Sequence, residues 1–575
     1  MRVLQGLAAS PGIAIGPAFR LERAPVRYQR TAAADREREL LRFQQAVEVA
    51  ARQLEEVHAR AAAESGASQA AIFEAQALML QDPELLQKVR AAVEEEGIGA
   101  EAAVSDAAEE YIGILEALDD DYLRARSRDV RDVADRLLRA LLGVSDSASA
   151  GLQTPSIIVA RDLTPSDTVA LDKSLVLGFC TAEGGTTSHT AILARALALP
   201  AVVGLGPGIL EIEDGTPLAL DAGAGTVWVE PDAGTVAHCR AQRAAVAAFM
   251  LQAQGRAMEP AVTRDGHRVE VMANVGDVEG AWAALLAGAE GIGLLRSEFL
   301  YLERPTMPGE EEQYQAYRRI LEVLDGRPVT LRTLDVGGDK GLHYIQMPPQ
   351  MNPSLGLRGI RLCLARPDIF RPQLRAALRA GAGHSLRVMF PMVSTLGEVR
   401  AAREMLESCR NELRAEGHPV ADQMEVGVMV EVPAAALMAD RLAAEVDFFS
   451  IGTNDLSQYV MAADRTSAEV AHLADAFHPA VLRLVRDVIA AAHARGRRVG
   501  LCGELAGEPL AIPVLLGLGL DELSISPPRV PLAKQVIRAL TIAEARDIAA
   551  QALALDSPEE IQARVRERVA GAGIQ

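Results

Sequence analysis

Two kinds of hydrophobic spacing divide this chain of 575 residues. Between about residues 33 and 143, apolar side chains recur at steps of three and four, which is the stripe of a helix that packs on other helices. Gly66 and Asp82-Pro83 interrupt the stripe, and it resumes over 84–95, 100–118 and 127–142. The pattern predicts a helical subdomain of four or more helices. Its first run consists of Leu40, Phe43, Val47, Ala50, Leu54 and Val57.

Short β-type segments lie on both sides of this helical stretch. Residues 1–21 are apolar but broken by Pro11, Gly12 and Gly16, and they offer too few strands for a domain. The simplest arrangement lets them complete a sheet formed by residues 154–230, with the helical unit inserted between, because insertions at exposed loops are tolerated. The predicted domains are therefore 1–21 plus 144–230, with an insert at 22–143. The later strand candidates are 156–160, 175–179, 201–203, 217–220 and 226–229.

From residue 261 to 575, β-like segments alternate with amphipathic helical ones. An Ala/Gln/Arg-rich stretch at 231–260 precedes them and is predicted to be a linker helix. A doubly wound open sheet is the alternative, but the count of strands favours a (β/α)8 barrel. The eight candidate strands are 268–273, 292–295, 329–334, 386–390, 425–430, 447–451, 498–502 and 522–525.

Composition narrows the class of protein. A formal net charge of -20 disfavours nucleic acid and anionic membranes as partners. The sequence has no apolar run long enough to cross a bilayer and no basic-then-apolar signal at Met1, so we expect a cytoplasmic protein. Its five cysteines are scattered without a CxxC pair, which argues against disulfides and a zinc site.

The stretch 183–195 is a glycine-loosened turn that leads into an Ala/Leu helix. Gly184 and Gly185 permit backbone conformations closed to other residues, and Thr187 or Ser188 can cap the helix. His189 then lies near free backbone N–H groups at the positive end of a helix dipole, where an anion such as phosphate is stabilised. Taken alone, an exposed polar histidine without a function is the more common explanation.

Charged side chains follow the ends of the predicted barrel strands, where barrel enzymes place their active sites. Arg296, Arg332 and Arg358 would meet at one mouth, and guanidinium groups match phosphate and carboxylate oxygens. Glu431 and Asp455 would make the sparse oxygen site that Mg²⁺ prefers. Such residues often merely pair with one another, but this number at one end, with Asn454 and Cys502, favours a site for a phosphorylated substrate.

The phosphoryl donor for such a site is not expected to be a nucleotide. The chain has neither a P-loop GxxxxGK[ST] nor a dinucleotide GxGxxG that opens a helix after a strand. A glycine-rich segment at 204–208 lacks the required spacing.

The full set of motifs resembles the Enzyme I family of the bacterial phosphotransferase system, the phosphoenolpyruvate-protein phosphotransferases. The resemblance covers essentially the whole chain. It rests on residues 185–204 around the histidine, 291–299 (GIGLLRSEF), 331–335, 352–361 (NPSLGLRGIR), 430–434 (VEVPA), 448–458 (FFSIGTNDLSQ) and 501–507 (LCGELAG).

The resemblance implies a reaction and a division of roles. His189 is the residue that phosphoenolpyruvate phosphorylates, and Cys502 protonates the pyruvate enolate. Glu431 and Asp455 bind Mg²⁺, while the substrate is bound by Arg296, Arg332, Arg358, Asn454 and Arg465. The helical insert docks HPr, the small carrier that accepts the phosphoryl group, and the barrel forms a homodimer. Because the barrel mouth and the helical insert belong to different domains, His189 has to travel between them, with the linker as the hinge.

Two positions depart from the family pattern. Thr186 replaces an arginine common in relatives, and Gln76 replaces a histidine.

Three rival interpretations exist. Phosphoenolpyruvate synthases and pyruvate phosphate dikinases need a nucleotide-grasp domain for which this chain has no room. The nitrogen-related Enzyme I branch carries an extra N-terminal sensor domain. A catalytically silent scaffold that binds HPr-like proteins is the alternative from another functional class.

Overall fold

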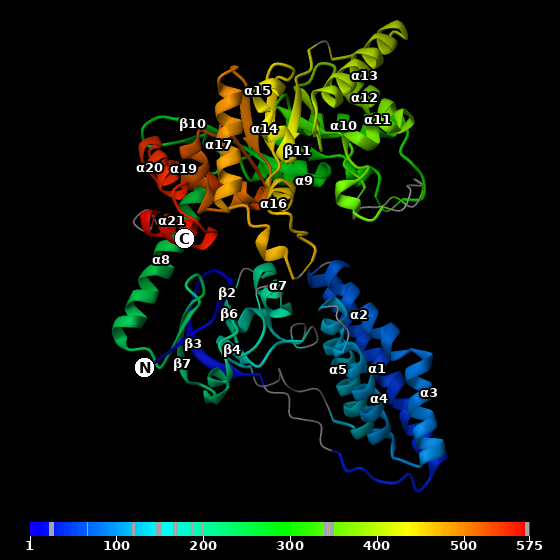
Figure 1. Cartoon of the computed structure of the whole chain (residues 1–575). Helices are drawn as coiled ribbons and strands as arrows, with labels where there is room; N and C mark the ends of the chain where they lie inside the picture. Colours follow the sequence, from blue (N-terminus) through cyan, green and yellow to red (C-terminus); the bar gives the residue numbers. More distant parts are fainter. Residues whose placement is uncertain are drawn as a thin grey trace. The chain divides into compact units, whose positions relative to one another are not determined.

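The computed structural model divides the chain into two compact units, Met1–Ala245 and Val246–Gln575, each described here by itself (Figure 1). The structure describes residues 1–21, 28–65, 67–117, 121–144, 152–164, 167, 171–185, 188–197, 199–302, 304–337, 342, 344, 350–421, 423–467, 469–569 and 574. No helix among these residues is both long and apolar enough to cross a membrane.

The first unit contains an eight-stranded sheet in the order β1-β8-β7-β3-β4-β5-β6-β2. The first three strands pair with the later ones: β3 lies parallel to β4 and antiparallel to β7, which confirms that the N-terminal segment completes the later sheet. The strands are β1 (Arg2–Gln5), β2 (Leu7–Ser10), β3 (Ile13–Arg20), β4 (Ser156–Ala160), β5 (Val176–Thr181), β6 (Ala201–Val203), β7 (Pro217–Asp221) and β8 (Thr226–Val229).

Among the described residues of this unit, five α-helices form the helical part, with a core of their own that includes Phe43, Leu54 and Leu137. Asp82 caps α3 by accepting the backbone N–H groups of Glu84 and Leu85, and Pro83 occupies the first helical position. The helices are α1 (Arg36–Ser65), α2 (Ala67–Leu80), α3 (Pro83–Ala91), α4 (Ala100–Glu116) and α5 (Asp121–Leu142), with a π-helical turn at Ala92–Glu96. Helix α8 (Ala233–Gly255) spans the boundary between the two units.

The second unit is a closed barrel of eight parallel strands, since β10 pairs with both β11 and β17. This closure confirms the predicted barrel and excludes the open sheet. The short strand β9 (Ala261–Val262) adds to β10 from outside. The barrel strands are β10 (Arg268–Val275), β11 (Ile292–Arg296), β12 (Val329–Arg332), β13 (Leu386–Phe390), β14 (Val426–Val430), β15 (Phe448–Ile451), β16 (Arg498–Leu501) and β17 (Glu522–Ile525).

Helices surround the barrel, and their apolar faces form the largest core of the protein with the outward faces of the strands (Figure 1). They are α9 (Val278–Leu286), α10 (Glu310–Leu324), α11 (Ile360–Ala365), α12 (Pro367–Ala380), α13 (Leu396–Ala415), α14 (Pro433–Leu437), α15 (Ala439–Leu442), α16 (Thr453–Met461), α17 (Pro479–His493), α18 (Ala511–Leu518), α19 (Val530–Arg538), α20 (Ile542–Ala552) and α21 (Pro558–Val569).

A fully buried lysine ties the segment after α8 to the barrel. Lys534 of α19 donates hydrogen bonds from Nζ to the carbonyls of Ala257 at 3.0 Å, Glu259 at 3.1 Å and Gly288 at 2.5 Å. Its side chain is 0% exposed. Burial lowers the pKa of Lys534, so the three carbonyls are what keeps its charge tolerable inside the protein.

We expect Lys534→Met to destabilise the barrel by about 3 kcal/mol, because it leaves buried carbonyls without a donor. The measurement is urea denaturation followed by Trp282 fluorescence in a Trp228→Phe background, since these are the only tryptophans. Arg568→Met is the control: Arg568 is 42% exposed in its pair with Asp547, and exposed pairs contribute about 1 kcal/mol or less. If both substitutions destabilised the protein equally, the buried hydrogen bonds of Lys534 would not have the stabilising role assigned to them.

Candidate active site

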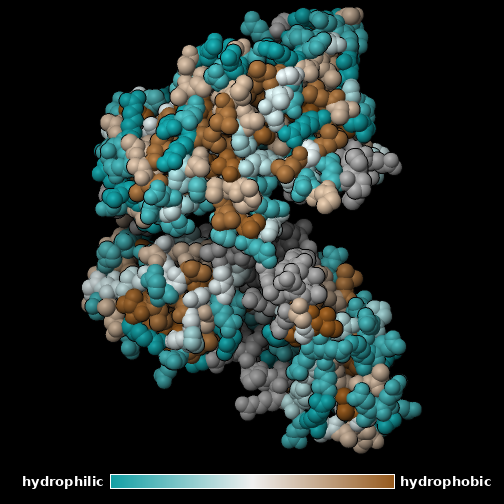
Figure 2. Space-filling view, in the orientation of Figure 1, coloured by the Kyte–Doolittle hydropathy of each residue, from teal (hydrophilic) through white to brown (hydrophobic). Residues whose placement is uncertain are grey.

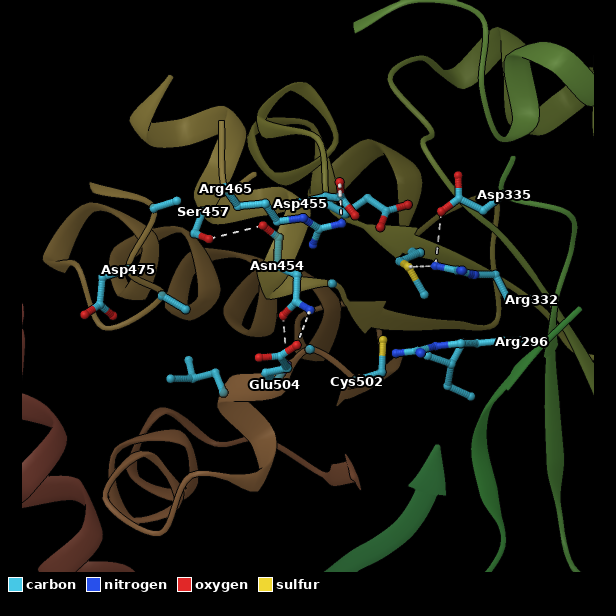
Figure 3. Close-up of a pocket in the computed structure, with 18 of the residues that line it drawn as sticks. Arg296, Arg332, Asp335, Asn454, Asp455, Ser457, Arg465, Asp475, Cys502 and Glu504 are labelled. Atoms are coloured by element: carbon cyan, nitrogen blue, oxygen red, sulfur yellow. Dashed lines mark hydrogen bonds and ion pairs between the residues drawn. The ribbon is translucent and has the colours of Figure 1, made fainter. Parts of the chain in front are cut away.

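A pocket of about 540 Å³ opens at the carboxyl ends of the barrel strands. Figure 3 shows its polar side chains: Arg296 and Arg332 extend into it from one side, and Arg465 reaches in from the other. The structure brings together all eight predicted barrel site residues in its lining, namely Arg296, Arg332, Arg358, Glu431, Asn454, Asp455, Arg465 and Cys502.

Two arginines of the pocket are buried and paired with acids. Arg332 ends β12, and its guanidinium lies 3.2 Å from a carboxylate oxygen of Glu298 and 3.3 Å from one of Asp335. Arg358 donates from Nη2 and Nε to both oxygens of Asp335, at 3.0 and 3.2 Å, and from Nη1 to Asp455 at 3.1 Å. Asp335 therefore bridges the two guanidinium groups.

The neighbouring acids raise the pKa of both arginines by more than burial lowers it. Burial alone would lower the pKa of Arg332, but the carboxylates of Glu298 and Asp335 raise it. The pKa of Arg358 is likewise raised by Asp335 and Asp455 against the effect of burial. Both guanidinium groups are thus permanently charged and fixed in position before any ligand arrives.

The other two arginines are more open to solvent. Within the described part of the chain, Arg296 makes no hydrogen bond or ion pair, and it is exposed at the end of β11. Arg465 lies 3.9 Å from Asp455, and its side chain is 34% exposed. A fixed inner pair and a more accessible outer pair of guanidinium groups would suit a small ligand with more than one anionic group.

Two carboxyl groups in the lining of the pocket, those of Glu431 and Asp455, are buried. Glu431 is 1% exposed and Asp455 6%. Burial, together with the nearby carboxylates of Asp455 and Asp335, raises the pKa of Glu431. The carboxyl oxygens of Glu431 and Asp455 are the kind of donor that fits a divalent cation such as Mg²⁺.

Cys502 lies on the pocket floor as a protonated thiol. Its Sγ donates to the carbonyl of Ile451 at 3.7 Å, and its backbone carbonyl accepts from the amide of Asn274 at 3.0 Å. Burial raises the pKa of Cys502 to about 11. A thiol with that pKa is a proton donor at neutral pH rather than a nucleophile.

Asn454 is held by a reciprocal pair of hydrogen bonds with Glu504. Its Oδ1 accepts the backbone N–H of Glu504 at 2.9 Å, and its Nδ2 donates to the Glu504 carboxylate at 3.4 Å. Figure 3 shows both contacts beside Asp455. Asn454 and Asp455 are consecutive residues of α16, and they thus place an amide and a carboxylate side by side at the mouth of the pocket.

The predicted histidine begins a helix in the first unit. Helix α7 runs over His189–Ala196, and Ser188 caps it by accepting the N–H of Ala191 at 3.3 Å. The cap confirms Ser188, one of the two predicted candidates; Thr186 and Thr187 lie outside the described residues. Gly184 has φ +95°, a conformation that favours glycine. The backbone therefore provides the predicted helix N-terminus at His189.

Sequence reasoning gave no role to two acids that the structure places in the charge network. Glu298 and Asp335 were recognisable only as charged residues that follow strands, and neither position reveals which arginine it contacts.

Gln76 is 1% exposed, and its amide donates to Asp132 at 3.3 Å inside the helical bundle. Gln76, one of the two positions that depart from the family pattern, thus lies in the interior of the bundle.

Comparisons with known proteins agree with the geometry. Models of PEP-utilising enzymes match residues 252–542 as the PEP-binding domain, 5–126 as the N-terminal domain and 152–225 as the mobile domain. The phosphoenolpyruvate-protein phosphotransferases of Bacillus sp. (strain S) and Geobacillus stearothermophilus are each 46% identical over 98% of this chain and 98% of their own. A solution structure of an Enzyme I protein, nEIt, is 40% identical over 42% of this chain and 98% of that chain, with a TM-score of 0.38. The chain belongs to the family of phosphoenolpyruvate-protein phosphotransferases.

Proposed function

We propose that this protein transfers the phosphoryl group of phosphoenolpyruvate to its own His189 and then to a histidine of an HPr-type carrier, with release of pyruvate. The observation that carries the proposal is the barrel pocket. It combines four arginines, a pair of buried acids and a protonated thiol in about 540 Å³. Phosphoenolpyruvate needs these same elements: anion binders for phosphate and carboxylate, charge neutralisation, and a proton for the enolate.

The arginines and Asn454 position the substrate. Arg332 and Arg358 are held rigid by Asp335, so they offer N–H donors without reorganisation during the reaction. Arg296 and Arg465 can close on the ligand from the rim. Glu431 and Asp455 would hold Mg²⁺, which supplies positive charge to the phosphate and enolate oxygens.

The reaction then needs little covalent help from the protein. A neutral imidazole nitrogen of His189 attacks the phosphorus in line, since the attacking nitrogen needs a free lone pair. The P–O bond breaks, and its electrons remain on the enolate oxygen. Cys502 gives its thiol proton to C3 of the enolate, which becomes the methyl group of pyruvate.

Labelled phosphate transfer tests this function. Purified protein, Mg²⁺ and phosphoenolpyruvate with a labelled phosphate are mixed with and without HPr, beside a His189→Ala control. We expect acid-labile, base-stable label on the wild type alone, and its movement to HPr. Label that stays on the protein would remove HPr as the acceptor. No label on the wild type would overturn the enzyme and favour the silent scaffold.

The helical bundle offers a place for the carrier. A cavity of about 180 Å³ opens among α1 to α5, with a lining that is almost entirely apolar. Its walls include Met79, Leu85, Leu115 and Val130, and Asp82 lies at its edge. An apolar side chain of a carrier that enters this cavity would be buried from water, which stabilises a complex.

We expect Leu85→Ala to raise the KM for HPr about tenfold, because it removes apolar contact at the cavity wall, equivalent to about 1.4 kcal/mol. Phosphorylation of the protein by phosphoenolpyruvate should not change, since Leu85 lies outside the barrel. Leu78→Ala is the matched control, because Leu78 is 68% exposed and does not line the cavity. A KM unchanged in Leu85→Ala would place the carrier elsewhere.

The barrel carries apolar side chains that a second copy of the chain would cover. Met351 is 97% exposed and Leu355 62%, and both line one cavity together with Val432 and Pro433. Figure 2 shows apolar residues at the surface of the barrel unit between polar ones. Because exposed large apolar groups mark interaction sites, we assign this face to homodimer formation. Sedimentation of Leu355→Glu tests the assignment: a dimer as tight as that of the wild type would exclude this face.

A further inference from the structure

The inside of the barrel below Cys502 is lined by small and polar residues. Side chains of a strand alternate between its two faces. Phe448 and Cys502 belong to the cluster inside the barrel, so Ser450 on β15 and Gly500 on β16 also face inward. The register places Ser450 opposite Gly500, and Gly500 opposite Glu522 of β17.

Because Gly500 stands between Ser450 and Glu522 in the register, no side chain of β16 lies between them at this level. A Cβ added to Gly500 would lie 3.1 Å from Oε1 of Glu522, and one added to Gly293 would lie 2.6 Å from the same atom. The carboxyl group of Glu522 therefore occupies the space that these two glycines leave open inside the barrel.

Ser450 also contacts the thiol above it. Ser450 is 4% exposed, and its side chain acts on the thiol by lowering the pKa of Cys502 against the larger effect of burial. Ser450 and Glu522 line one cavity of about 30 Å³ beneath the pocket floor. That volume is enough for a water molecule.

The cavity lies at the end of the barrel opposite the pocket, where its charged residues meet solvent. Arg387 lies 2.7 Å from Glu425 and 3.8 Å from Glu522. The side chain of Glu425 is 57% exposed and that of Glu522 13%. Polar groups thus run from solvent at this end through Glu522 and Ser450 to Cys502.

We propose that Ser450 and Glu522 form a proton path that reprotonates Cys502 through the inside of the barrel, away from the substrate pocket. The proposal rests on the proposed function, in which Cys502 protonates the enolate. Once its S–H bond has broken, the sulfur keeps the electron pair as a thiolate. The hydroxyl proton of Ser450 moves to the sulfur, and Ser450 regains a proton from Glu522 directly or through water in the cavity. Glu522 takes its next proton from solvent.

The titration of Glu522 suits this task. Burial raises the pKa of its carboxyl to about 7, with Glu270 and Asp521 acting in the same direction and Arg387 and Arg498 opposing them. Glu425 and Asp447 are the other acids that line the cavity. A group with a pKa near neutrality can both accept a proton from solvent and give it up.

The test compares two exchange rates in D₂O at equilibrium with Mg²⁺, phosphoenolpyruvate and pyruvate. One is the entry of deuterium into the pyruvate methyl group, and the other is the interchange of labelled pyruvate with phosphoenolpyruvate. In the wild type we expect a ratio above one, because Cys502 exchanges its hydrogen with solvent while pyruvate is still bound. In Ser450→Ala and Glu522→Gln we expect the excess over one to be lost and the ratio to fall to about one, since Cys502 then returns the hydrogen that it removed.

Two controls separate the path from a structural role. Ser450→Thr keeps the hydroxyl and should retain the wild-type ratio. Glu425→Gln removes a charge that lines the same cavity and pairs with the same Arg387, and it should also leave the ratio unchanged. A wild-type ratio of one, or a ratio unchanged in Ser450→Ala, would overturn the path. Absence of any interchange in the wild type would instead overturn the proposed function.

Discussion

Glu431→Gln is expected to lower kcat about 1,000-fold, equivalent to about 4 kcal/mol of transition-state stabilisation. Glu431 is 1% exposed, and the carboxylates of Asp455 and Asp335 lie close enough to raise its pKa. An amide would remove one of the two charged oxygen ligands proposed for Mg²⁺ while keeping the size of the side chain. Initial rates of pyruvate release over a range of Mg²⁺ concentrations measure the loss.

Glu508→Gln is the matched control for this experiment. Glu508 lines the same pocket, but its carboxylate pairs with Arg529 at 2.5 Å and has no proposed role toward the metal. We expect less than a threefold change in kcat. If Glu431→Gln retained wild-type kcat at saturating Mg²⁺, Glu431 could not be a required ligand.

The binding of Mg²⁺ should weaken as the pH falls. Because the pKa of Glu431 is raised in the metal-free site, the carboxyl retains a proton to higher pH than an ordinary glutamic acid. A cation must displace that proton, so affinity decreases once the pH drops below the raised pKa. Calorimetric titration with Mg²⁺ in buffers of different ionisation enthalpy should detect the proton released. An affinity independent of pH, with no proton released, would contradict this prediction.

The barrel could be predicted from the sequence because its strands are short apolar runs between amphipathic helices. The runs 386–390 and 522–525 coincide with β13 and β17. Parallel strands that are buried on both faces carry an almost continuous apolar signal, and strand ends then locate the charged residues at one mouth. That reasoning placed Arg332 and Asp455 in one pocket without information about their contacts.

The pairing inside the pocket could not be predicted in this way. Asp335 contacts Arg358 across 23 positions of sequence, and Arg358 contacts Asp455 across 97. Such contacts depend on barrel closure and on side-chain direction, which hydrophobic spacing does not encode. For the same reason the polar interior around Ser450 and Glu522 was not apparent, because glycine at position 500 matters only through its register with two other strands.

Asp335→Asn is expected to lower kcat/KM for phosphoenolpyruvate by about 100-fold to 1,000-fold, equivalent to about 3–4 kcal/mol. Asp335 is 2% exposed and accepts two hydrogen bonds from Arg358, at 3.0 and 3.2 Å, while lying 3.3 Å from Arg332. A neutral amide would present one oxygen and one N–H group, so it could not hold a guanidinium by both oxygens. Both buried arginines would lose their fixed orientation toward the substrate.

The change should also weaken Mg²⁺ binding, although Asp335 is not a proposed ligand. Arg358 already reaches Asp455 at 3.1 Å, and without Asp335 it would be drawn further to that carboxylate. Arg358 would then compete with the cation for Asp455. We therefore expect a higher apparent Kd for Mg²⁺ by calorimetry in Asp335→Asn.

Asp475→Asn provides the comparison that gives this result its meaning. Asp475 lines the same pocket, but its carboxylate accepts a hydrogen bond from the backbone N–H of Phe477 and contacts no arginine in the described part of the chain. Its kcat/KM should remain within about threefold of the wild type. Equal losses in the two variants would mean that the pocket responds to its total charge. A loss confined to Asp335→Asn would mean that catalysis depends on one carboxylate that holds two guanidinium groups in place.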